Sequence, residues 1–490
     1  MRLAALIAKI AVVKTVGDLE IDINGIAQDS RQVQKGNLFL CVKGVKNDGH
    51  LFLRQAAAAG AVAAVVETMP ADNFGLAVIQ VSKVNAVIKE IAGAFYDYPD
   101  RRLKLIGVVG TNGKTTSTYL MKEILEVAGY KVGLIGTIAN IIGNQQLPVN
   151  NTTPGVLELQ KLFAQMVQAG IEWVVMEVSS HSIDQGRIAG LNFENGLFTN
   201  ITQDHLDYHG SFAEYLRVKT SFFTGLPRTS WAAINMDDPH AEYIIERTGA
   251  KVIRYGLGPN AEVRAENIQI SPAGVSYQAV TPVGSRELRL HLSGSFNVYN
   301  SLGVLAALMS LGIDLTTIQK GLETVRGVPG RFQLVPGSSS FGVIVDYAHT
   351  PDGLENILKT GRQLTPRRLL LTFGCGGDRD RTKRPIMGAL AAKLADYTII
   401  TSDNPRSEEP IEIIKEIEAG FKDGNPKAEY DIEADRAAAI RKIIGMAQAA
   451  DLVIIAGKGH ETYQEFANRE RIHFDDLEIA AAVLQSGPHH

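Results

Sequence analysis

Short apolar runs, each followed by a polar loop and then by a helix-like stretch, recur along this chain and constrain its fold more than any other feature. Residues 105–109, 343–345 and 452–455 are examples, and their apolar character is nearly continuous rather than alternating. Strands that are apolar on both sides are typical of parallel sheets with helices on both faces. The pattern therefore predicts an α/β fold with largely parallel sheets, and a ligand site where the strands end.

The 490 residues predict about three domains, at roughly 150 residues per domain. Proline and charges at 98–102, and a Gly-Val-Pro-Gly sequence at 327–330, interrupt the pattern. We expect an N-terminal α/β domain, a central domain with a mostly parallel sheet and an antiparallel patch over 261–292, and a C-terminal Rossmann-like domain. Their expected bounds are 1–98, 99–330 and 331–490. The predicted strands are 38–42, 63–66, 77–79, 105–109, 173–176, 196–198, 343–345, 369–373, 398–401 and 452–455, and two predicted helices are 51–60 and 212–223.

Composition excludes several functional classes. The 49 Lys and Arg against 53 Asp and Glu give a net charge of −4, which argues against a nucleic-acid coat protein. The longest apolar run, Ala56–Val66, is shorter than the ~18 residues that a membrane span requires. The two cysteines, Cys41 and Cys375, fit a reducing cytoplasm rather than a disulfide scaffold. We expect a cytoplasmic monomer that acts on small molecules and binds neither nucleic acid nor membrane.

Residues 110–116 follow a predicted strand and precede an amphipathic helix, as a phosphate-binding loop does. Glycines in such a loop let backbone N–H groups face phosphate oxygens, and the helix N-terminus adds a favourable dipole. The strict pattern requires a glycine where Val108 stands, so this is a shortened variant; a glycine turn that binds nothing is the alternative. Lys114 is suited to the β- and γ-phosphates and Thr115 to Mg²⁺. The loop comprises Gly110, Thr111, Asn112, Gly113, Lys114, Thr115 and Thr116.

Acidic and histidine side chains follow the next strands. Glu177 ends the predicted strand 173–176, where a carboxylate can reach a phosphate-bound Mg²⁺. Four ionisable side chains over 204–209 follow another strand, and His205 among them is a candidate ligand of a second metal ion. Lys219 lies in the predicted helix 212–223, where its residue type alone indicates only a buried stem with a solvated head.

Four loops of the third region carry charged or amide side chains directly after predicted strands. Residues 374–385 place basic residues around two aspartates, and arginine captures carboxylates in bidentate fashion. Residues 403–406 combine an acid, an amide and a guanidinium, which suits a zwitterion with an amine and a carboxylate. Residues 457–461 and 346–351 follow two further strands. A charged surface loop is the alternative for each one alone, but four in one domain predict a ligand site.

In these segments the chain resembles the Mur ligases, the ATP-dependent amide ligases of peptidoglycan precursor synthesis. Within the family, Asp29-Ser30-Arg31 resembles the N-terminal UDP-site motif of the branch that adds the third residue of the peptide stem. Residues 403–406, Asp-Asn-Pro-Arg, resemble the signature of members that add meso-diaminopimelate, whereas members that add L-lysine typically depart from it at the arginine. The resemblance spans the chain, and its motifs stand in family order at residues 110–116, 177–181, 204–205, 219, 297–300, 330–332 and 346–351.

The resemblance implies a role for each matching residue. It implies that Lys219 is carbamylated to N6-carboxylysine, which turns a cation into an oxygen ligand. Catalysis would rest on Lys114, Glu177, His205 and Lys219, and Mg²⁺ would be held by Thr115, Glu177, His205 and Lys219. The nucleotide side would add Asn297, Arg331, Asp346 and His349 to the phosphate loop. The UDP-linked substrate would contact Ser30, Asn151, Thr152, Thr153, Ser179, Gln185 and Arg187. The diaminopimelate pocket would comprise Arg379, Asp403, Asn404, Pro405, Arg406, Gly457 and Glu461.

One local prediction accompanies these roles. Thr153 followed by Pro154 predicts a helix N-cap with proline in the first turn, which is a natural site for an anion.

The activity that the resemblance implies is the joining of meso-diaminopimelate to the D-Glu γ-carboxylate of UDP-N-acetylmuramoyl-L-Ala-D-Glu through an acyl phosphate, with ATP and Mg²⁺. Ligation of L-lysine and a folylpolyglutamate-synthetase-like activity are the nearest alternatives, and the motif at 29–31 argues against the second. A P-loop switch or motor ATPase would leave the arginine loops unexplained. A non-catalytic homologue is disfavoured because Lys114, Glu177, His205 and Lys219 are all present.

Overall fold

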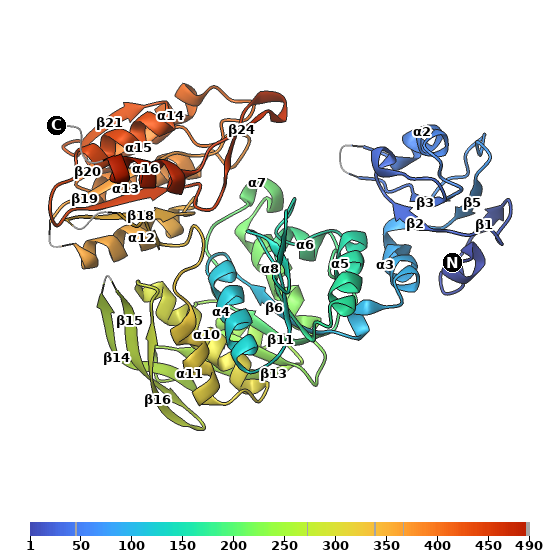
Figure 1. Ribbon diagram of the computed structural model, residues 1–490, viewed down its shortest axis with the longest axis horizontal. Coiled ribbons are helices and arrows are strands. Elements are labelled where there is room, and N and C mark those ends of the chain that lie inside the picture. Colours follow the sequence, from blue (N-terminus) through green and yellow to red (C-terminus); the bar gives the residue numbers. More distant parts are fainter. Residues whose placement is uncertain (45–46, 272, 338–339, 366, 487–490) are drawn as a thin grey trace.

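The computed structural model describes residues 1–44, 47–271, 273–337, 340–365 and 367–486. These residues form an N-terminal, a central and a C-terminal lobe, each built on its own large sheet and coloured from blue to red along the chain in Figure 1. Most strands inside each sheet pair in parallel, and helices cover both faces. The prediction of an α/β fold with largely parallel sheets is confirmed.

The N-terminal lobe has a sheet with the order β1-β5-β4-β3-β2, in which only the edge strand β1 is antiparallel to its neighbour among the described residues. Leu38 and Leu40 face α1 and α3, whereas Phe39 between them faces α2, as the two-residue repeat of a strand requires. The elements are α1 (Leu3–Ile7), β1 (Lys14–Val16), β2 (Gly25–Ala27), β3 (Asn37–Leu40), α2 (Leu53–Ala58), β4 (Ala63–Val66), β5 (Ala77–Gln80) and α3 (Val84–Phe95), and the 3-10 helices are η1 (Ser30–Gln32), η2 (Gly49–Phe52) and η3 (Pro99–Arg101).

The central lobe has an 11-stranded sheet with the order β16-β15-β14-β13-β12-β11-β6-β10-β7-β8-β9. Strands β13 to β7 in this order are parallel, and β14, β15 and β16 form the antiparallel patch that the sequence predicted over 261–292. Its strands are β6 (Lys104–Val109), β7 (Val132–Ile135), β8 (Asn140–Ile142), β9 (Gln145–Leu147), β10 (Trp173–Glu177), β11 (Phe193–Phe198), β12 (Trp231–Asn235), β13 (Lys251–Gly256), β14 (Val263–Ser271), β15 (Gly274–Thr281) and β16 (Gly284–Leu290).

Helices cover both faces of the central sheet. Ile106 and Val108 of β6 pack in one core with α4, α10 and α11, and Leu105 and Val109 pack in the other with α5 and α8. The helices are α4 (Lys114–Val127), α5 (Val156–Gln168), α6 (Ser180–Asp184), α7 (Leu206–His209), α8 (Phe212–Thr224), α9 (Ala241–Ile245), α10 (Ser295–Ser310) and α11 (Leu315–Thr324).

The C-terminal lobe has a sheet with the order β17-β18-β22-β19-β20-β21, parallel except for β17. Because β18, β22, β19 and β20 are parallel neighbours, the four predicted loops leave the sheet at the same edge. The elements are β17 (Gln333–Leu334), β18 (Gly342–Asp346), α12 (Pro351–Leu364), β19 (Leu369–Phe373), α13 (Lys383–Leu394), β20 (Tyr397–Thr401), α14 (Pro410–Gly424), β21 (Glu429–Glu433), α15 (Arg436–Gly445), β22 (Leu452–Ala456), β23 (Tyr463–Glu465), η4 (Ala467–Arg469), β24 (Arg471–His473) and α16 (Asp476–Ser486).

The predicted elements are present with small shifts. Each predicted strand is found with its ends moved by three residues or fewer, and the predicted helices 51–60 and 212–223 correspond to α2 and α8. The N-cap prediction at Thr153 is wrong, because α5 begins at Val156 and its N-cap is Gly155. The Thr153 hydroxyl instead donates to the carbonyl of Glu177 at the end of β10, 2.8 Å away.

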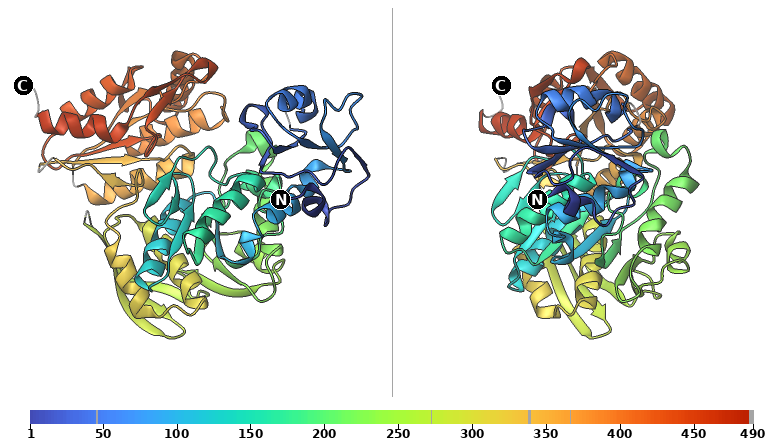
Figure 2. Two further views of the ribbon diagram at one scale, coloured as in Figure 1. Left: turned by 45° about the vertical axis from the view of Figure 1, so that its right-hand side comes forward. Right: turned by 90° about the vertical axis from the view of Figure 1, so that its right-hand side faces the viewer.

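The N-terminal and C-terminal lobes stand on different sides of the central lobe, and Figure 2 shows the N-terminal lobe at one end of the long axis. The N-terminal lobe contacts α5 through α3, and the C-terminal lobe contacts β14 through α12. Two hydrogen bonds cross between the central and C-terminal lobes near the phosphate loop: Asn112 Nδ2 donates to Asp352 Oδ2 at 2.6 Å, and Arg331 donates to Thr115 Oγ1 at 2.9 Å. The phosphate loop therefore lies at the junction of these two lobes.

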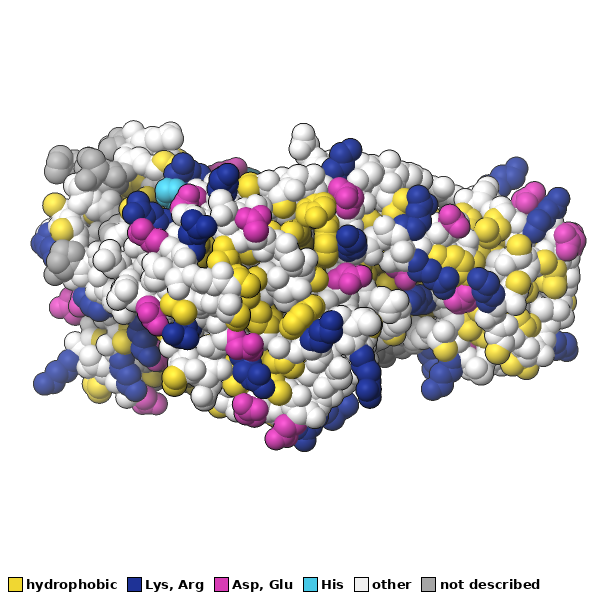
Figure 3. Space-filling model, turned by 90° about the horizontal axis from the view of Figure 1, so that it is seen from below, with side chains coloured by type: hydrophobic (Ala, Val, Ile, Leu, Met, Phe, Trp, Pro, Cys, Tyr) yellow, Lys and Arg dark blue, Asp and Glu magenta, His cyan; other side chains and the backbone are white. Residues whose placement is uncertain are grey.

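The surface mixes charges of both signs. Figure 3 shows basic and acidic side chains interspersed with small apolar patches over one face of the molecule. This distribution agrees with the small net charge and gives that face no broad field of one sign. In the part of the chain that the structure describes, no helix combines the length and the apolar character needed to cross a membrane.

Candidate active site

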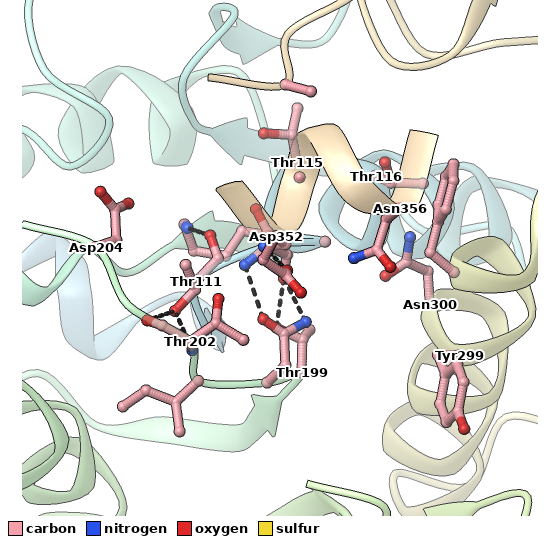
Figure 4. Close-up of a pocket in the computed structure, with 18 of the residues that line it drawn as sticks. Thr111, Thr115, Thr116, Thr199, Thr202, Asp204, Tyr299, Asn300, Asp352 and Asn356 are labelled. Atoms are coloured by element: carbon pink, nitrogen blue, oxygen red, sulfur yellow. Dashed lines mark hydrogen bonds between the residues drawn. The ribbon is translucent and has the colours of Figure 1, made fainter. Parts of the chain in front are cut away.

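A cavity of about 590 Å³ lies between the central and C-terminal lobes. Its walls come from the phosphate loop, the carboxyl ends of β10, β11 and β12, the first turns of α10, and the segment that links β18 to α12. Figure 4 shows its hydroxyl and amide side chains, with Asp204 on one side and Tyr299 and Asn300 on the other. The cavity thus lies where parallel strands end, as the sequence predicted.

Close contacts require glycine at two positions of the phosphate loop. Gly113 has a φ of +85° and is the N-cap of α4, and a Cβ there would lie 2.3 Å from Asn300 Oδ1. A Cβ on Gly110 would lie 1.8 Å from Thr199 Oγ1. The loop therefore packs closely against Thr199, which follows β11, and against Asn300 of α10.

The Lys114 side chain folds back over the loop. Its Nζ donates to the carbonyl oxygens of Gly110 and Thr111 at 2.9 and 2.8 Å. Burial lowers the pKa of Lys114, and the carboxylates of Glu177 and Asp204 oppose this shift. A cation in this position is suited to the phosphates of a nucleotide.

Thr115 and Glu177 place two side chains with oxygen atoms, the ligand type of hard metal ions, next to each other. Thr115 Oγ1 lies 3.0 Å from Glu177 Oε1, and the backbone N and the hydroxyl of Thr137 donate to the two oxygens of the same carboxylate at 2.8 and 3.0 Å. Across the described ranges no group of three or more His, Cys, Asp and Glu residues is arranged to hold a metal ion. The pair fits Mg²⁺ all the same, because this ion usually takes one or two protein oxygens and completes its shell with water and phosphate.

Among the described residues, His205 lines the cavity, whereas Lys219 does not. Lys219 is 2% exposed, and its Nζ lies 4.7 Å from the centroid of the Tyr215 ring. Burial, and then the charge of Lys114, lowers the pKa of Lys219 well below its ordinary value. Burial also lowers the pKa of His205, whose Nε2 lies 3.4 Å from Asp204 Oδ2. A neutral amine and a neutral imidazole are the forms that carbamylation and metal binding require.

The nucleotide-side residues divide into those that line the cavity and one that does not. Arg331, Asp346 and His349 line it, whereas Asn297 lies behind the wall and accepts a hydrogen bond from Asn300, which does line it. Asp346 accepts hydrogen bonds from the backbone N of Phe332 and Ala348 at 2.6 and 2.7 Å, and burial raises its pKa against the effect of Arg331. Asp346 therefore shapes the link between the lobes as well as the cavity.

Several cavity residues were not singled out from the sequence, among them Asp352, Thr137 and Asn200. Asp352 receives the hydrogen bond from Asn112, and burial raises its pKa. Thr137, which follows β7, holds Glu177. Asn200 accepts a hydrogen bond from Asn112 N at 2.9 Å. Only Asp352 could have been suspected from the sequence, because it is a carboxylate in the first turn of α12. Thr137 and Asn200 belong to no recognisable local pattern.

The residues expected to contact the UDP-linked substrate form a cluster beside Glu177, with two exceptions. Thr153 donates to the Glu177 carbonyl and accepts from Ser179 N at 3.1 Å, and Arg187 donates to the Thr153 carbonyl at 2.8 Å and to Gln185 at 3.0 Å. Thr152 joins the cluster through a 3.1 Å contact with Thr137. The exceptions are Asn151, which is exposed, and Ser30, which lies in the N-terminal lobe and donates to Gln55.

The loops after β20 and β22 meet in the C-terminal lobe. Asn404 Nδ2 donates to Glu461 at 2.8 Å, and the buried Lys458 donates to both Asn404 and Glu461 at 3.0 Å. Gly457 has a φ of +118°, and a Cβ there would lie 2.7 Å from Asp403 Oδ2. Burial would raise the pKa of Asp403, but Lys458 and Arg436 hold it below its ordinary value.

The arginine loop adjoins this group. Arg406, at a φ of +52°, donates to the Gly377 carbonyl at 2.7 Å, and a Cβ on Gly377 would lie 1.9 Å from the Pro405 carbonyl oxygen. Arg379 is exposed and donates to the Asp378 carbonyl at 3.0 Å. The structure thus brings the segments 374–385 and 403–406 together. Neither segment lines the cavity, but Lys383 donates to the carbonyl of His349, which does, at 2.9 Å.

Comparisons with known proteins agree along the whole chain. Family models described as "Mur ligase family, catalytic domain", "Mur ligase middle domain" and "Mur ligase, glutamate ligase domain" match residues 22–101, 108–308 and 330–459. A protein of Clostridium acetobutylicum named UDP-N-acetylmuramoyl-L-alanyl-D-glutamate--2,6-diaminopimelate ligase 1 is 44% identical over 487 residues, which is 99% of each chain. A ligase of Geobacillus thermodenitrificans with the same name, without the numeral, is 47% identical over 470 residues, 95% of each.

A solved structure of a UDP-N-acetylmuramoyl-L-alanyl-D-glutamate--2,6-diaminopimelate ligase superimposes with a TM-score of 0.67. It is 32% identical to this chain, and the match covers 100% of both chains.

Proposed function

This chain belongs to the Mur ligase family of ATP-dependent ligases, and from that premise we propose that it joins meso-diaminopimelate to the D-Glu γ-carboxylate of UDP-N-acetylmuramoyl-L-Ala-D-Glu. The names of relatives that are 44% and 47% identical over nearly their whole length support this substrate assignment. The sequence Asp-Asn-Pro-Arg at 403–406 supports diaminopimelate over L-lysine.

One observation carries the proposal: a series of side-chain contacts joins the phosphate loop to the loops after β20 and β22, which we call the amino-acid loops. Arg331 donates to Thr115, and its guanidinium lies 4.6 Å from the centroid of the Tyr347 ring. That ring lies 5.0 Å from the ring of His460, the neighbour of Glu461. An acyl phosphate formed at the phosphate loop would therefore be close to an amino acid held by the loops after β20 and β22.

The chemistry requires activation of a carboxylate, because oxide is a poor leaving group. A carboxylate oxygen attacks the γ-phosphorus of ATP, the bond to ADP breaks, and an acyl phosphate forms. The amine of diaminopimelate then attacks the acyl carbon, the C–O bond breaks, inorganic phosphate leaves, and the nitrogen loses a proton. The protein's contribution is positioning and neutralisation of charge.

Each group in the cavity has a proposed part in these steps. Lys114 would neutralise charge on the transferring phosphoryl group. Thr115 and Glu177 would hold Mg²⁺, and His205 with carbamylated Lys219 would hold a second ion. Such ions, when bound, stabilise the charge on the phosphate oxygens.

The amino-acid loops would recognise the zwitterion. Glu461 and Asp403 offer carboxylates to an ammonium group, and Asn404 offers an amide. Arg406, with Arg379 near it, would hold a carboxylate of diaminopimelate in bidentate fashion. Pro405 and Gly457 would shape the backbone of these loops.

The remaining site residues would serve the other two substrates. Thr152, Thr153, Ser179, Gln185 and Arg187 would contact the UDP-linked dipeptide, with Asn151 and, from the N-terminal lobe, Ser30. Arg331, Asp346 and His349 would contact ATP, and Asn297 would act through Asn300. We further propose domain bounds of 1–98, 99–330 and 331–490, and a monomer that works in the cytoplasm.

Phosphate release tests this proposal. The protein is incubated with ATP, Mg²⁺ and UDP-N-acetylmuramoyl-L-Ala-D-Glu, and meso-diaminopimelate or L-lysine is added in parallel. We expect release that requires both the dipeptide and diaminopimelate. Release with lysine alone would keep the ligase but refute the assignment of residues 403–406, and release that ignores every addition would refute ligation.

A further inference from the structure

A buried ion pair lies beneath the two amino-acid loops of the C-terminal lobe. Arg436, the first residue of α15, is 1% exposed, and Asp476, the first residue of α16, is fully buried. Arg436 Nε donates to Asp476 Oδ1 at 2.8 Å and its NH2 donates to Oδ2 at 2.7 Å. This is the bidentate geometry that fixes the plane of a guanidinium most firmly.

The remaining donors of Arg436 reach the ends of two strands. Its NH1 donates to the Ser402 carbonyl at 3.2 Å, and its NH2 also donates to the Ala456 carbonyl at 2.9 Å. Ser402 stands directly before Asp403, and Ala456 directly before Gly457. Since β19 lies between β20 and β22 in the sheet, no backbone ladder joins these two ends, and Arg436 joins them instead.

Stability alone does not explain this arrangement. Desolvation of two buried charges offsets most of their attraction, and a well-packed apolar pair of the same volume often stabilises a fold equally well. An apolar pair would hold α15 against α16, but it could not donate hydrogen bonds to two carbonyl oxygens. The distinctive contribution of Arg436 is therefore the placement of the two strand ends.

The charge of Arg436 also reaches the candidate pocket. Together with Lys458 it holds the pKa of Asp403 below its ordinary value in spite of burial. A Cβ on Gly457 would lie 2.7 Å from Asp403 Oδ2 and 3.8 Å from Arg436 NH2, so the three groups are closely packed. Movement of the Arg436 guanidinium would therefore change both the position and the charge of Asp403 in the candidate amino-acid pocket.

We propose that Arg436 and Asp476 are positioning residues for the amino-acid substrate, and that they fix the spacing between the 403–406 and 457–461 loops. The inference rests on the proposed function, because it takes these loops to be the amino-acid pocket. Neither residue touches the substrate, and both act through the backbone carbonyls that precede Asp403 and Gly457.

The test compares Asp476→Asn with Asp451→Asn. Asp451 also has a fully buried side chain, and it pairs with Arg368 at 2.6 Å, but at the opposite ends of β19 and β22. We expect Asp476→Asn to raise the KM for diaminopimelate by about tenfold, the lower end of the effect that loss of an outer hydrogen-bond partner has at metal sites. The KM values for ATP and the UDP-linked dipeptide should stay within about twofold. Asp451→Asn should lower the Tm and leave all three KM values unchanged.

A second variant keeps the inference testable if Asp476→Asn does not fold. Arg436→Lys keeps the positive charge but cannot form the bidentate pair with Asp476, so it should also raise the KM for diaminopimelate selectively. Equal changes in all three KM values, or an unchanged KM for diaminopimelate in both folded variants, would overturn the inference. Failure of the native enzyme to use diaminopimelate would instead refute the proposed function, and the inference that rests on it.

Discussion

At the scale of single residues, the candidate site is built from side chains that are held in place by neighbours that no local sequence pattern predicts. Glu177 was predicted because a carboxylate ends a buried strand, yet both its oxygens are held by Thr137, which follows β7 without any recognisable motif. Thr153 was predicted to cap a helix, and its hydroxyl binds the Glu177 carbonyl instead. Local patterns identify the groups that are proposed to do chemistry, whereas the residues that hold them in place are distant in sequence.

Lys219 provides the sharpest test at this scale. No hydrogen bond or ion pair of its amine is found among the described residues, and its side chain is 2% exposed. Burying a polar group without a partner destabilises a fold. We expect Lys219→Met to lower kcat for ligation by on the order of a hundredfold or more, and to leave the Tm equal to or above that of the native protein.

The measurements are steady-state ligation and thermal unfolding of the same preparations. Leu216→Met, on the same helix and only partly buried, is the matched control and should leave kcat unchanged. A Lys219→Met variant with native kcat would remove the carbamate from the mechanism.

At the scale of elements, the continuous apolar strands could be predicted because burial on both faces leaves a clear signal. Each of the ten was found, while short edge strands such as β1 and β9, whose residues are largely exposed, were not. The phosphate loop was predicted from its order of strand, loop and helix. What the sequence could not indicate is the packing between elements, for example the ion pairs of Arg384 in α13 with Glu408, just before α14, and with Glu416 in α14.

Those ion pairs predict a pH dependence of stability. Arg384 is fully buried and donates to Glu408 at 2.9 and 2.8 Å, and its hydrogen bonds lower the pKa of Glu408 to about 2. Because the folded-state pKa lies below the ordinary value, Glu408 stabilises the fold above about pH 4.5 and loses this effect as the pH falls towards about 2. Glu408→Gln should therefore lower the Tm at neutral pH, and the difference should shrink with acidification.

Thermal unfolding across this pH range checks the prediction. Glu412→Gln serves as control, because the pair of Glu412 with Lys415 is exposed on both sides and such pairs contribute little. A Tm difference for Glu408→Gln that stays constant down to about pH 2 would contradict the proposed ionic role.

At the scale of the whole molecule, the central and C-terminal lobes line one cavity, and the N-terminal lobe is proposed to add a contact to the UDP-linked substrate. The division of the chain could be anticipated from its length and its Pro- and Gly-rich breaks, but the way in which the lobes meet could not. The contact of Asn112 with Asp352 joins residues 240 positions apart. Arg331, between the central and C-terminal lobes, links the phosphate loop to Tyr347 and so connects the proposed nucleotide site to the proposed amino-acid site.

Transfer of oxygen from substrate to phosphate tests this arrangement most directly. The dipeptide substrate is prepared with ¹⁸O in the D-Glu γ-carboxylate and incubated with the protein, ATP, Mg²⁺ and meso-diaminopimelate, and the products are analysed by mass spectrometry. If the carboxylate is activated as an acyl phosphate and the amine displaces phosphate, each UDP-linked tripeptide formed should be matched by one phosphate that carries one ¹⁸O. Phosphate without label, or label without formation of the tripeptide, would contradict the proposal that one site couples the two steps.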